Sequence, residues 1–203
     1  SGIKPLIYTA ALESGMTPAT LINDAPVVFD QTEGATDWRP QNSGGTFLGP
    51  TRLRKALYRS RNLVSVRLVR KLGINQIIGI AQRFGLDVKK LPRDLSLSLG
   101  TASLTPLEMA ETYSIFANGG YQIKSHLIDR IESSDGITLY QTVPVSVCRE
   151  LCEGRSTSVD LDFDNRIRAS TSDFLKPDHT GHDAPRVIDK RIHFLMNDML
   201  KDV

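Results

Sequence analysis

The sequence predicts a helix-rich globular domain, and its patterning and composition both support this prediction. Several segments carry apolar residues at helical spacing, and one pair of short segments flanks a turn typical of a β-hairpin. Of the 203 residues, 40% are hydrophobic and 24% are charged, which suffices to bury a sizeable core. No apolar run is long enough to cross a bilayer, no signal-peptide pattern occurs, and the formal net charge of +2 neither indicates nor excludes an anionic partner.

The first expected helix covers residues 1–14. Pro5 is compatible with it because proline is tolerated in the first helical turn, and Gly15 is a typical helix end. Residues 24–50 are rich in polar residues, Gly and Pro, which predicts a long ordered loop. Loops of this length inside a compact domain often carry function.

Further helices are expected between residues 51 and 84. The pattern of residues 51–59 is helical, and the sequence Ser60-Arg61-Asn62 interrupts it. Asn62 is expected to cap a helix that runs to Leu72 and ends at Gly73, because asparagine is favoured at helix starts and glycine just after helix ends. Another helix is expected over residues 75–84.

Two neighbouring segments give different kinds of signal. Residues 95–100 alternate Leu and Ser, which by itself favours a strand. The segment that follows has a strong helix start, with Thr105 as cap, Pro106 at the first helical position and Glu108 completing a capping box. We expect this helix to run to Ala117.

The remainder of the chain contains a hairpin, a polar stretch and a final helix. Residues 127–132 and 137–143 flank a Ser-Ser-Asp-Gly turn and predict the hairpin. Residues 144–184 are polar with little periodicity and are interpreted as an insertion or flexible linker, whereas residues 186–201 return to helical spacing. The chain thus divides into a first domain segment, the insertion, and a closing helix that continues the domain: 1–143, 144–184 and 185–203.

Two cysteines and two histidines fall in the polar stretch. Cys148 and Cys152 either form a local disulfide or are free thiols in a polar insertion. No nearby Cys or His completes a zinc set at a usual spacing, and His179 and His182 lie where the sequence shows no regular structure. The sequence therefore predicts no metal site and no cofactor.

The sequence Ser1-Gly2-Ile3-Lys4 is the main candidate for catalytic chemistry. Residues three apart share a helix face, so the Lys4 amine is expected beside the Ser1 hydroxyl. A serine hydroxyl is a poor nucleophile until a nearby base takes its proton, and a neutral lysine can be that base. Further along, the Ser60 hydroxyl and the Asn62 carboxamide are candidates for a proton relay and a substrate anchor.

These motifs occur in an order and at a spacing that match one family. Ser-x-x-Lys followed by Ser-x-Asn resembles the first two signatures of the penicillin-interacting serine enzymes. Apart from residues 144–184, the chain resembles the transpeptidase domain of class A penicillin-binding proteins, most of all the 1A type of Gram-negative bacteria. The stretches that carry the resemblance are Ser1 to Pro5, Ile7 to Ala11, Asn23 to Pro26, Trp38 to Asn42, Gly49 to Arg54, Ser60 to Asn62, Leu97 to Gly100, Thr105 to Ala110, Phe116 to Tyr121 and Arg186 to Asp189.

The resemblance implies a fold and an activity. The implied fold is the α/β serine β-lactamase-like transpeptidase fold, in which residues 95–100 would be a tight active-site loop. The implied activity is that of a peptidoglycan D,D-transpeptidase, with Ser1 as nucleophile, Lys4 as its base, Ser60 as relay and Asn62 as substrate-binding residue. The implied partners are peptidoglycan stem peptides and β-lactam antibiotics, without nucleic acid or cofactor. The implied location is the periplasmic face of the bacterial inner membrane.

The third signature of the family, Lys-Thr-Gly, does not occur. The sequence His179-Thr180-Gly181 is not a substitute, because it precedes the final helix and lacks the apolar alternation of a strand. We therefore expect a fragment, with most of the core sheet, a glycosyltransferase domain and a membrane anchor outside this sequence. Helices without their sheet would expose apolar patches, so we expect self-association and no transpeptidation by the chain alone.

Alternatives remain open from the sequence. One is a serine β-lactamase-like hydrolase, although no Glu stands in the expected water-activating context, and another is a non-catalytic penicillin-binding or scaffold module. The basic residues between positions 52 and 71 either attract an anionic partner or form a solvated helix face, and the interleaved Leu and Val favour the second interpretation. Trp38 and Tyr58 either line a substrate cleft or pack in the interior.

Overall fold

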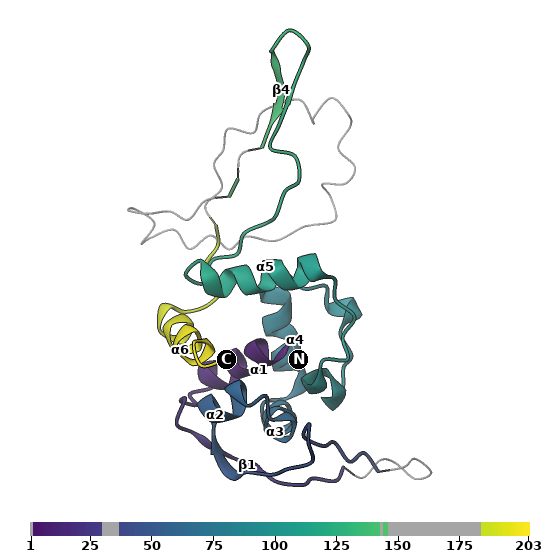
Figure 1. Ribbon diagram of the computed structural model, residues 1–203, viewed down its shortest axis with the longest axis vertical. Helices are drawn as coiled ribbons and strands as arrows, with labels where there is room; N and C mark the ends of the chain where they lie inside the picture. Colours follow the sequence, from purple (N-terminus) through teal and green to yellow (C-terminus); the bar gives the residue numbers. More distant parts are fainter. Residues whose placement is uncertain (1, 30–36, 143, 146–183) are drawn as a thin grey trace. The chain divides into compact units, whose positions relative to one another are not determined.

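The computed structural model describes residues 2–29, 37–142, 144–145 and 184–203. Contacts divide the chain into two compact units, residues 1–120 with 187–203, and residues 121–186. The first unit is shown in Figure 1 and comprises α1 (Lys4–Glu13), β1 (Leu21–Asp24), β2 (Gly49–Arg52), α2 (Leu53–Tyr58), α3 (Asn62–Leu72), α4 (Ile74–Arg83), the 3-10 helices η1 (Val88–Lys90) and η2 (Leu95–Leu99), α5 (Pro106–Ala117) and α6 (Lys190–Leu200).

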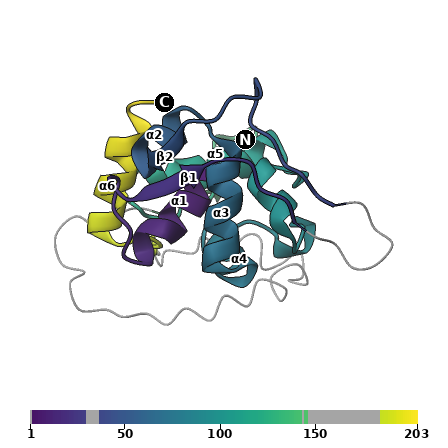
Figure 2. The same ribbon diagram turned by 90° about the horizontal axis from the view of Figure 1, so that it is seen from below.

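Helix α1 is the centre of the first unit. It contacts α2, α3, α4 and α6, which surround it in Figures 1 and 2. Every residue from Lys4 to Leu12 is buried. A helix that is enclosed on all sides needs apolar or small side chains around its whole circumference, and the sequence of α1 has them. The buried hydroxyl of Thr9 donates to the carbonyl of Pro5 at 2.8 Å, which satisfies it within the helix.

A short antiparallel strand pair lies against α3. Leu21 of β1 pairs with Arg52 of β2, and Asp24 pairs with Gly49. The stretch expected to be a long loop therefore leaves one strand and returns along its partner. This pairing fixes both ends of the loop, which matters below because several residues of the loop contact the candidate site.

Two of the expected helix boundaries are confirmed in detail. After α1, Gly15 adopts a φ of 89°, a left-handed conformation that ends a helix and that glycine accepts without steric cost. Helix α5 begins with the expected capping box, in which the Thr105 side chain accepts from the Glu108 N–H and the Glu108 side chain accepts from the Thr105 N–H.

The expectation that Asn62 caps α3 is wrong. The cap position is occupied by Arg61, whose side chain makes no capping bond, and Asn62 is the first helical residue. The physical reason is competition for the carboxamide, because its oxygen accepts a hydrogen bond from Lys4. A side chain turned toward Lys4 does not also satisfy the free N–H groups of its own helix.

Two other local structures differ from what the sequence pattern alone favours. Residues 95–99 form the short 3-10 helix η2 and not the strand that the Leu and Ser alternation favours by itself, because the Asp94 side chain accepts a hydrogen bond from the Ser96 N–H and starts a helical turn. The last helix begins at Lys190 and not at residue 186, since Asp189 caps it by accepting from the Arg191 N–H.

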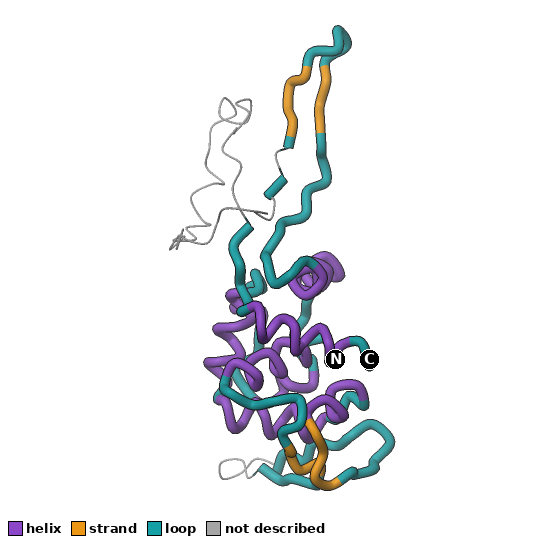
Figure 3. The backbone as a smooth tube through the Cα atoms, turned by 90° about the vertical axis from the view of Figure 1, so that its left-hand side faces the viewer, coloured by secondary structure: helices purple, strands orange, loops and turns teal. Residues whose placement is uncertain are grey.

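The second unit contains the predicted hairpin. Strands β3 (Arg130–Glu132) and β4 (Thr138–Gln141) pair in antiparallel fashion, with a register shift between Ile131 and Glu132. Figure 3 shows the strands of the described residues in orange; they form two separate two-stranded sheets. The helix-rich character expected from the sequence is thus confirmed.

Part of the sequence-based interpretation lies outside the described residues. This applies to most of the polar insertion, to Cys148 and Cys152, and to His179 and His182. The disulfide, the rejected metal site and the insertion itself therefore stay predictions.

Candidate active site

The amine of Lys4 connects the start of α1 to the turn that precedes α3. Its Nζ lies 2.7 Å from the backbone oxygen of Ser60, 2.8 Å from Oγ of Ser60 and 2.8 Å from Oδ1 of Asn62. A lysine ammonium has three N–H donors, and these three oxygens use them all. Lys4, Ser60 and Asn62, predicted as site residues from distant parts of the sequence, are therefore in direct contact.

A sharp turn between α2 and α3 presents Ser60 to Lys4. The N–H of Ser60 donates to the carbonyl of Leu57 at 2.8 Å, and the N–H of Arg61 donates to that of Ala56 at 2.9 Å. Within the described residues, Ser60 is the one non-glycine residue with a positive φ, 51°. This conformation costs a residue with a Cβ about 1 kcal/mol or more, so the surrounding contacts must stabilise it.

The protonation state of Lys4 is perturbed by its surroundings. The residue is only 3% exposed. Burial, and to a lesser extent the positive charge of Arg61, lower the pKa of Lys4 from 10.5 to about 8. Both effects disfavour the charged amine, because it loses hydration and faces a like charge. A larger share of the amine is therefore neutral near physiological pH than in an exposed lysine, and only the neutral form can accept a proton.

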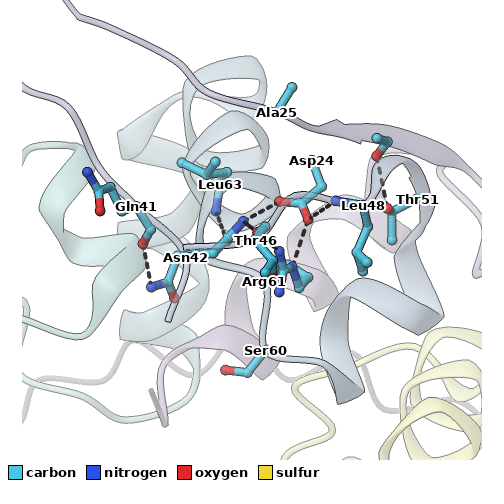
Figure 4. Close-up of polar contacts among 12 residues, drawn as sticks. Asp24, Ala25, Gln41, Asn42, Thr46, Leu48, Thr51, Ser60, Arg61 and Leu63 are labelled. Carbon is cyan, nitrogen blue, oxygen red and sulfur yellow. Dashed lines mark hydrogen bonds and ion pairs between the residues drawn. The ribbon is translucent and has the colours of Figure 1, made fainter. Parts of the chain in front are cut away.

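A buried polar network lies behind these contacts, and the sequence analysis did not identify it. The carboxylate of Asp24, 0% exposed, accepts from Nε of Arg61 at 2.7 Å, from Nδ2 of Asn42 at 2.7 Å and from the Leu48 N–H at 3.0 Å (Figure 4). The carbonyl of Thr46 accepts from both Arg61 and Asn42. A single sequence gives no signal that one arginine of a basic cluster points inward.

The basic residues between positions 52 and 71 are thus not simply a solvated helix face. Besides Arg61, the guanidinium of Arg54 pairs with Asp198 at 2.6 Å and with Asp202. Arg67 donates to the backbone oxygen of Ala25 at 3.1 Å. The expectation of a solvated face is wrong for Arg61, which is buried. Arg54 and Arg67 are half-buried and connect segments of the first unit.

Ser1 lies outside the described residues, so its position stays a prediction. Its neighbour Gly2 is described, and the hydroxyl of Tyr113 in α5 donates to the Gly2 carbonyl at 3.1 Å. A Cβ at Gly2 would lie 2.6 Å from Cε of Met109, also in α5. The backbone next to Ser1 is therefore packed closely against α5.

A pocket of about 400 Å³ is lined by Phe29, Trp38, Asp94, Leu95 and Ser96. The ring centroids of Phe29 and Trp38 are 5.3 Å apart. Trp38 therefore packs against an aromatic neighbour and also lines a pocket, and a substrate cleft at this place stays a prediction. Tyr58 is partly buried, and the guanidinium carbon of Arg59 lies 5.6 Å from its ring centroid.

In the described part of the chain, the His, Cys, Asp and Glu residues form no group of three or more that could hold a metal ion. Within the same described residues, no helix combines the length and the apolar character that a membrane span requires.

A lysine amine held together with a hydroxyl and a carboxamide is the arrangement that the resemblance to serine acyl-transfer enzymes implies. Residues 1–151 match the protein family described as penicillin binding protein transpeptidase domain. The chain belongs to this family.

Similar proteins agree with this assignment. The chain is 41% identical over 223 aligned residues to penicillin-binding protein 1A of Pseudomonas aeruginosa. This match covers 100% of this chain and 26% of that protein. It is also 41% identical over 201 residues to penicillin-binding protein 1A of Vibrio cholerae, covering 98% of this chain and 22% of that protein. The chain thus spans about a quarter of the length of these relatives.

Solved structures confirm the transpeptidase fold. The crystal structure of penicillin-binding protein 1A from Haemophilus influenzae matches with a TM-score of 0.80 and 34% identity, covering 98% of this chain and 29% of that one. A structure of penicillin-binding protein A from Mycobacterium tuberculosis, an imipenem acyl-enzyme complex, matches with a TM-score of 0.60 and 26% identity over 71% of this chain and 37% of that one.

Proposed function

We propose that the chain carries the acylated serine and the catalytic base of a peptidoglycan D,D-transpeptidase. In this proposal Ser1 is the nucleophile, Lys4 its base, Ser60 a proton relay and Asn62 an anchor for the substrate amide. One observation supports the proposal most strongly. The Lys4 amine lies 2.8 Å from both Oγ of Ser60 and Oδ1 of Asn62. Membership of the transpeptidase family and the identity to 1A proteins support the same function.

In the acylation step, the neutral amine of Lys4 takes the proton of the Ser1 hydroxyl while that oxygen attacks the carbonyl carbon of the penultimate D-Ala of a stem peptide. The backbone N–H of Ser1 donates to the oxyanion that forms, and such donors are often the largest single contribution to catalysis. The Ser60 hydroxyl passes the proton from Lys4 to the nitrogen of the terminal D-Ala. The C–N bond then breaks, and the stem peptide remains as an ester of Ser1.

In the second step, the amine of a neighbouring stem peptide attacks this ester. The amine loses a proton through Ser60 to Lys4, the ester oxygen regains one, and Ser1 is released as the cross-link forms. The contacts of Asn62 support its role as an anchor. Its Oδ1 accepts from Lys4 and its Nδ2 donates to the Gln41 carbonyl at 3.0 Å, so an amide held by Asn62 lies close to the base.

The proposal extends to inhibitors and to location. The amide of a β-lactam ring resembles the D-Ala-D-Ala bond and would acylate Ser1 in the same way, as imipenem does in the mycobacterial relative. We place the protein at the periplasmic face of the bacterial inner membrane, where stem peptides are cross-linked. It requires no nucleic acid and no cofactor.

The test is covalent labelling by a fluorescent penicillin. It uses a protein that contains this chain together with the other segments that its relatives possess, here called the full-length protein, with Ser1→Ala as control. Labelling that disappears in Ser1→Ala supports the proposal. A full-length protein that takes up no penicillin would indicate the scaffold alternative, and rapid turnover of a chromogenic cephalosporin would indicate the hydrolase.

A further inference from the structure

The three residues that follow Ser60 are each tied to one loop. The side chain of Asn62 donates to the Gln41 carbonyl at 3.0 Å, and the N–H of Leu63 donates to Oδ1 of Asn42 at 3.2 Å. The Arg61 guanidinium donates to the Thr46 carbonyl. The loop between β1 and β2 therefore fixes three consecutive residues, the cap and the first two residues of α3, directly after Ser60.

Asp24 is the common partner of these connections. Its carboxylate is fully buried and binds Arg61 from the turn, Asn42 from the loop and the Leu48 N–H. A buried carboxylate is costly unless it is paired and fully hydrogen-bonded, and this one has both kinds of partner. Figure 4 shows the Asp24 carboxylate between Arg61 and Asn42, with Ser60 at the adjoining part of the turn.

We propose that Asp24, Arg61 and Asn42 act as positioning residues that hold the Ser60 turn in the conformation in which its oxygens and that of Asn62 converge on the Lys4 amine. The inference rests on the proposed function, because it assigns these residues to the acylation of Ser1. The inference goes beyond the proposed function because it adds a buried ion pair that does not touch Lys4 to the residues on which acylation depends. The Ser60 backbone is strained, with a φ of 51°, and a strained turn needs such support.

Arg61 has a second effect in this arrangement, which is electrostatic. Its guanidinium is held by the Asp24 carboxylate and also by the Thr46 carbonyl, and its positive charge adds to burial in lowering the pKa of Lys4. The Tyr8 hydroxyl on the same helix stays protonated, since burial raises its pKa. Several titratable side chains on or next to the elements packed against α1 have other partners, namely Arg54, Arg67, Arg70, Arg83, Asp94 and His193. Lys55 of α2 and Lys71 of α3 are exposed.

The experiment measures the second-order rate constant of penicillin acylation between pH 6 and 10 in the full-length protein. The variants are Asp24→Asn, Arg61→Lys and the double variant Asp24→Asn/Arg61→Gln. The double variant removes both charges at once, so neither is left buried without its partner if the single change at Asp24 prevents folding. Arg83→Gln is the matched control, because Arg83 pairs with Glu13 at the opposite end of α1 and makes no contact with the turn.

We expect Asp24→Asn to acylate on the order of 100-fold more slowly at the optimal pH, because a small displacement of catalytic groups has effects of this size. Its pH midpoint should move to lower pH, since the Arg61 charge is no longer balanced. In the double variant the midpoint should move to higher pH, because the like charge beside Lys4 is gone. Arg61→Lys should keep the midpoint and lose rate, and Arg83→Gln should match the unchanged protein.

A second readout separates this inference from the proposed function. Competitive labelling of amines, followed by mass spectrometry of the peptide that contains Lys4, reports the ionisation of that amine without any acylation of serine. Shifts of the Lys4 titration midpoint in the directions given above support the inference even if the unchanged protein takes up no penicillin. Failure of the unchanged protein to take up penicillin would overturn the proposed function and not this inference. An unchanged Lys4 titration in both folded Asp24→Asn and the folded double variant would overturn the inference. Acylation at the unchanged rate by folded Asp24→Asn and Arg61→Lys would overturn it as well.

Discussion

The Nζ of Lys4 lies 2.8 Å from Oγ of Ser60 although 56 residues separate them in the sequence. This contact joins the central buried helix to an exposed, strained turn. The base and the relay of the proposed reaction thus come from elements that differ in burial. Changes to either element should have separable effects on folding and on acylation.

Replacing Lys4 by arginine should abolish acylation while retaining a positive charge at the site. A guanidinium stays protonated at all accessible pH values and cannot accept the Ser1 proton. We expect penicillin labelling of the full-length protein to fall by on the order of 100-fold or more, the usual contribution of a positioned base. Lys55→Arg is the control, because Lys55 is exposed. Labelling of Lys4→Arg at more than a tenth of the normal rate would contradict the role of Lys4 as base.

The acylation rate should depend on pH through Lys4. Since its pKa is lowered to about 8, the rate should fall about tenfold for each pH unit below that value and level off above it. Stopped-flow labelling with buffers of constant ionic strength measures this profile. A flat profile between pH 6 and 9 would exclude Lys4 as the titrating base.

The same shift affects stability with a defined sign. The pKa of Lys4 is about 8 in the folded chain and 10.5 when exposed, so the unfolded chain binds more protons between these values. Stability contributed by this group therefore rises with pH from about 8 to about 10.5. We expect the slope of unfolding free energy against pH in this window to be smaller in Lys4→Met. An equal slope in both proteins would show that Lys4 is not the group responsible.

Ser60 offers a matched pair of substitutions. Ser60→Ala and Ser60→Gly both remove the hydroxyl, so both should lose the proton relay and label slowly. They differ in backbone strain, because glycine accepts a φ of 51° without a Cβ clash. We expect the glycine variant to be more stable than the alanine variant by about 1 kcal/mol in denaturant unfolding. A less stable glycine variant would show that the turn is not strained.

The packing of buried side chains in α1 should contribute strongly to the stability of the fold. Ile7 is 0% exposed, and Ile7→Ala should lower stability by about 2 to 5 kcal/mol through lost burial and a cavity. Leu127→Ala is the comparison, since Leu127 is 97% exposed and should change stability by less than about 0.5 kcal/mol. Thermal and urea unfolding measure both. Similar losses for the two variants would contradict the central position of α1.

The residues that touch Lys4 could be predicted from the sequence, whereas those behind them could not. Ser-x-x-Lys and Ser-x-Asn are short patterns with a chemical reason for each residue type, and their order identified the family. Arg61 and Asp24 have no such pattern. Whether an arginine beside Ser60 is buried depends on a carboxylate 37 residues earlier in the chain, and nothing local to either residue indicates it.

Local structure was predictable where the signal stays within the segment. The capping box at Thr105 is such a case, because all of its hydrogen bonds form within four residues. Asn62 is the opposite case, since its side chain is claimed by Lys4 from a distant helix. The alternation of Leu and Ser in residues 95–99 favours a strand by itself, but a short 3-10 helix capped by Asp94 can carry the same pattern.

The enclosure of α1 on every side has a consequence for drug resistance. Nine consecutive residues there have no solvent-facing position, so an amino-acid change in this helix alters the fold as well as reactivity toward antibiotics. Selection by β-lactams should therefore leave this helix nearly invariant. Tolerated resistance mutations should instead collect at the accessible rim, for example in residues 43–48.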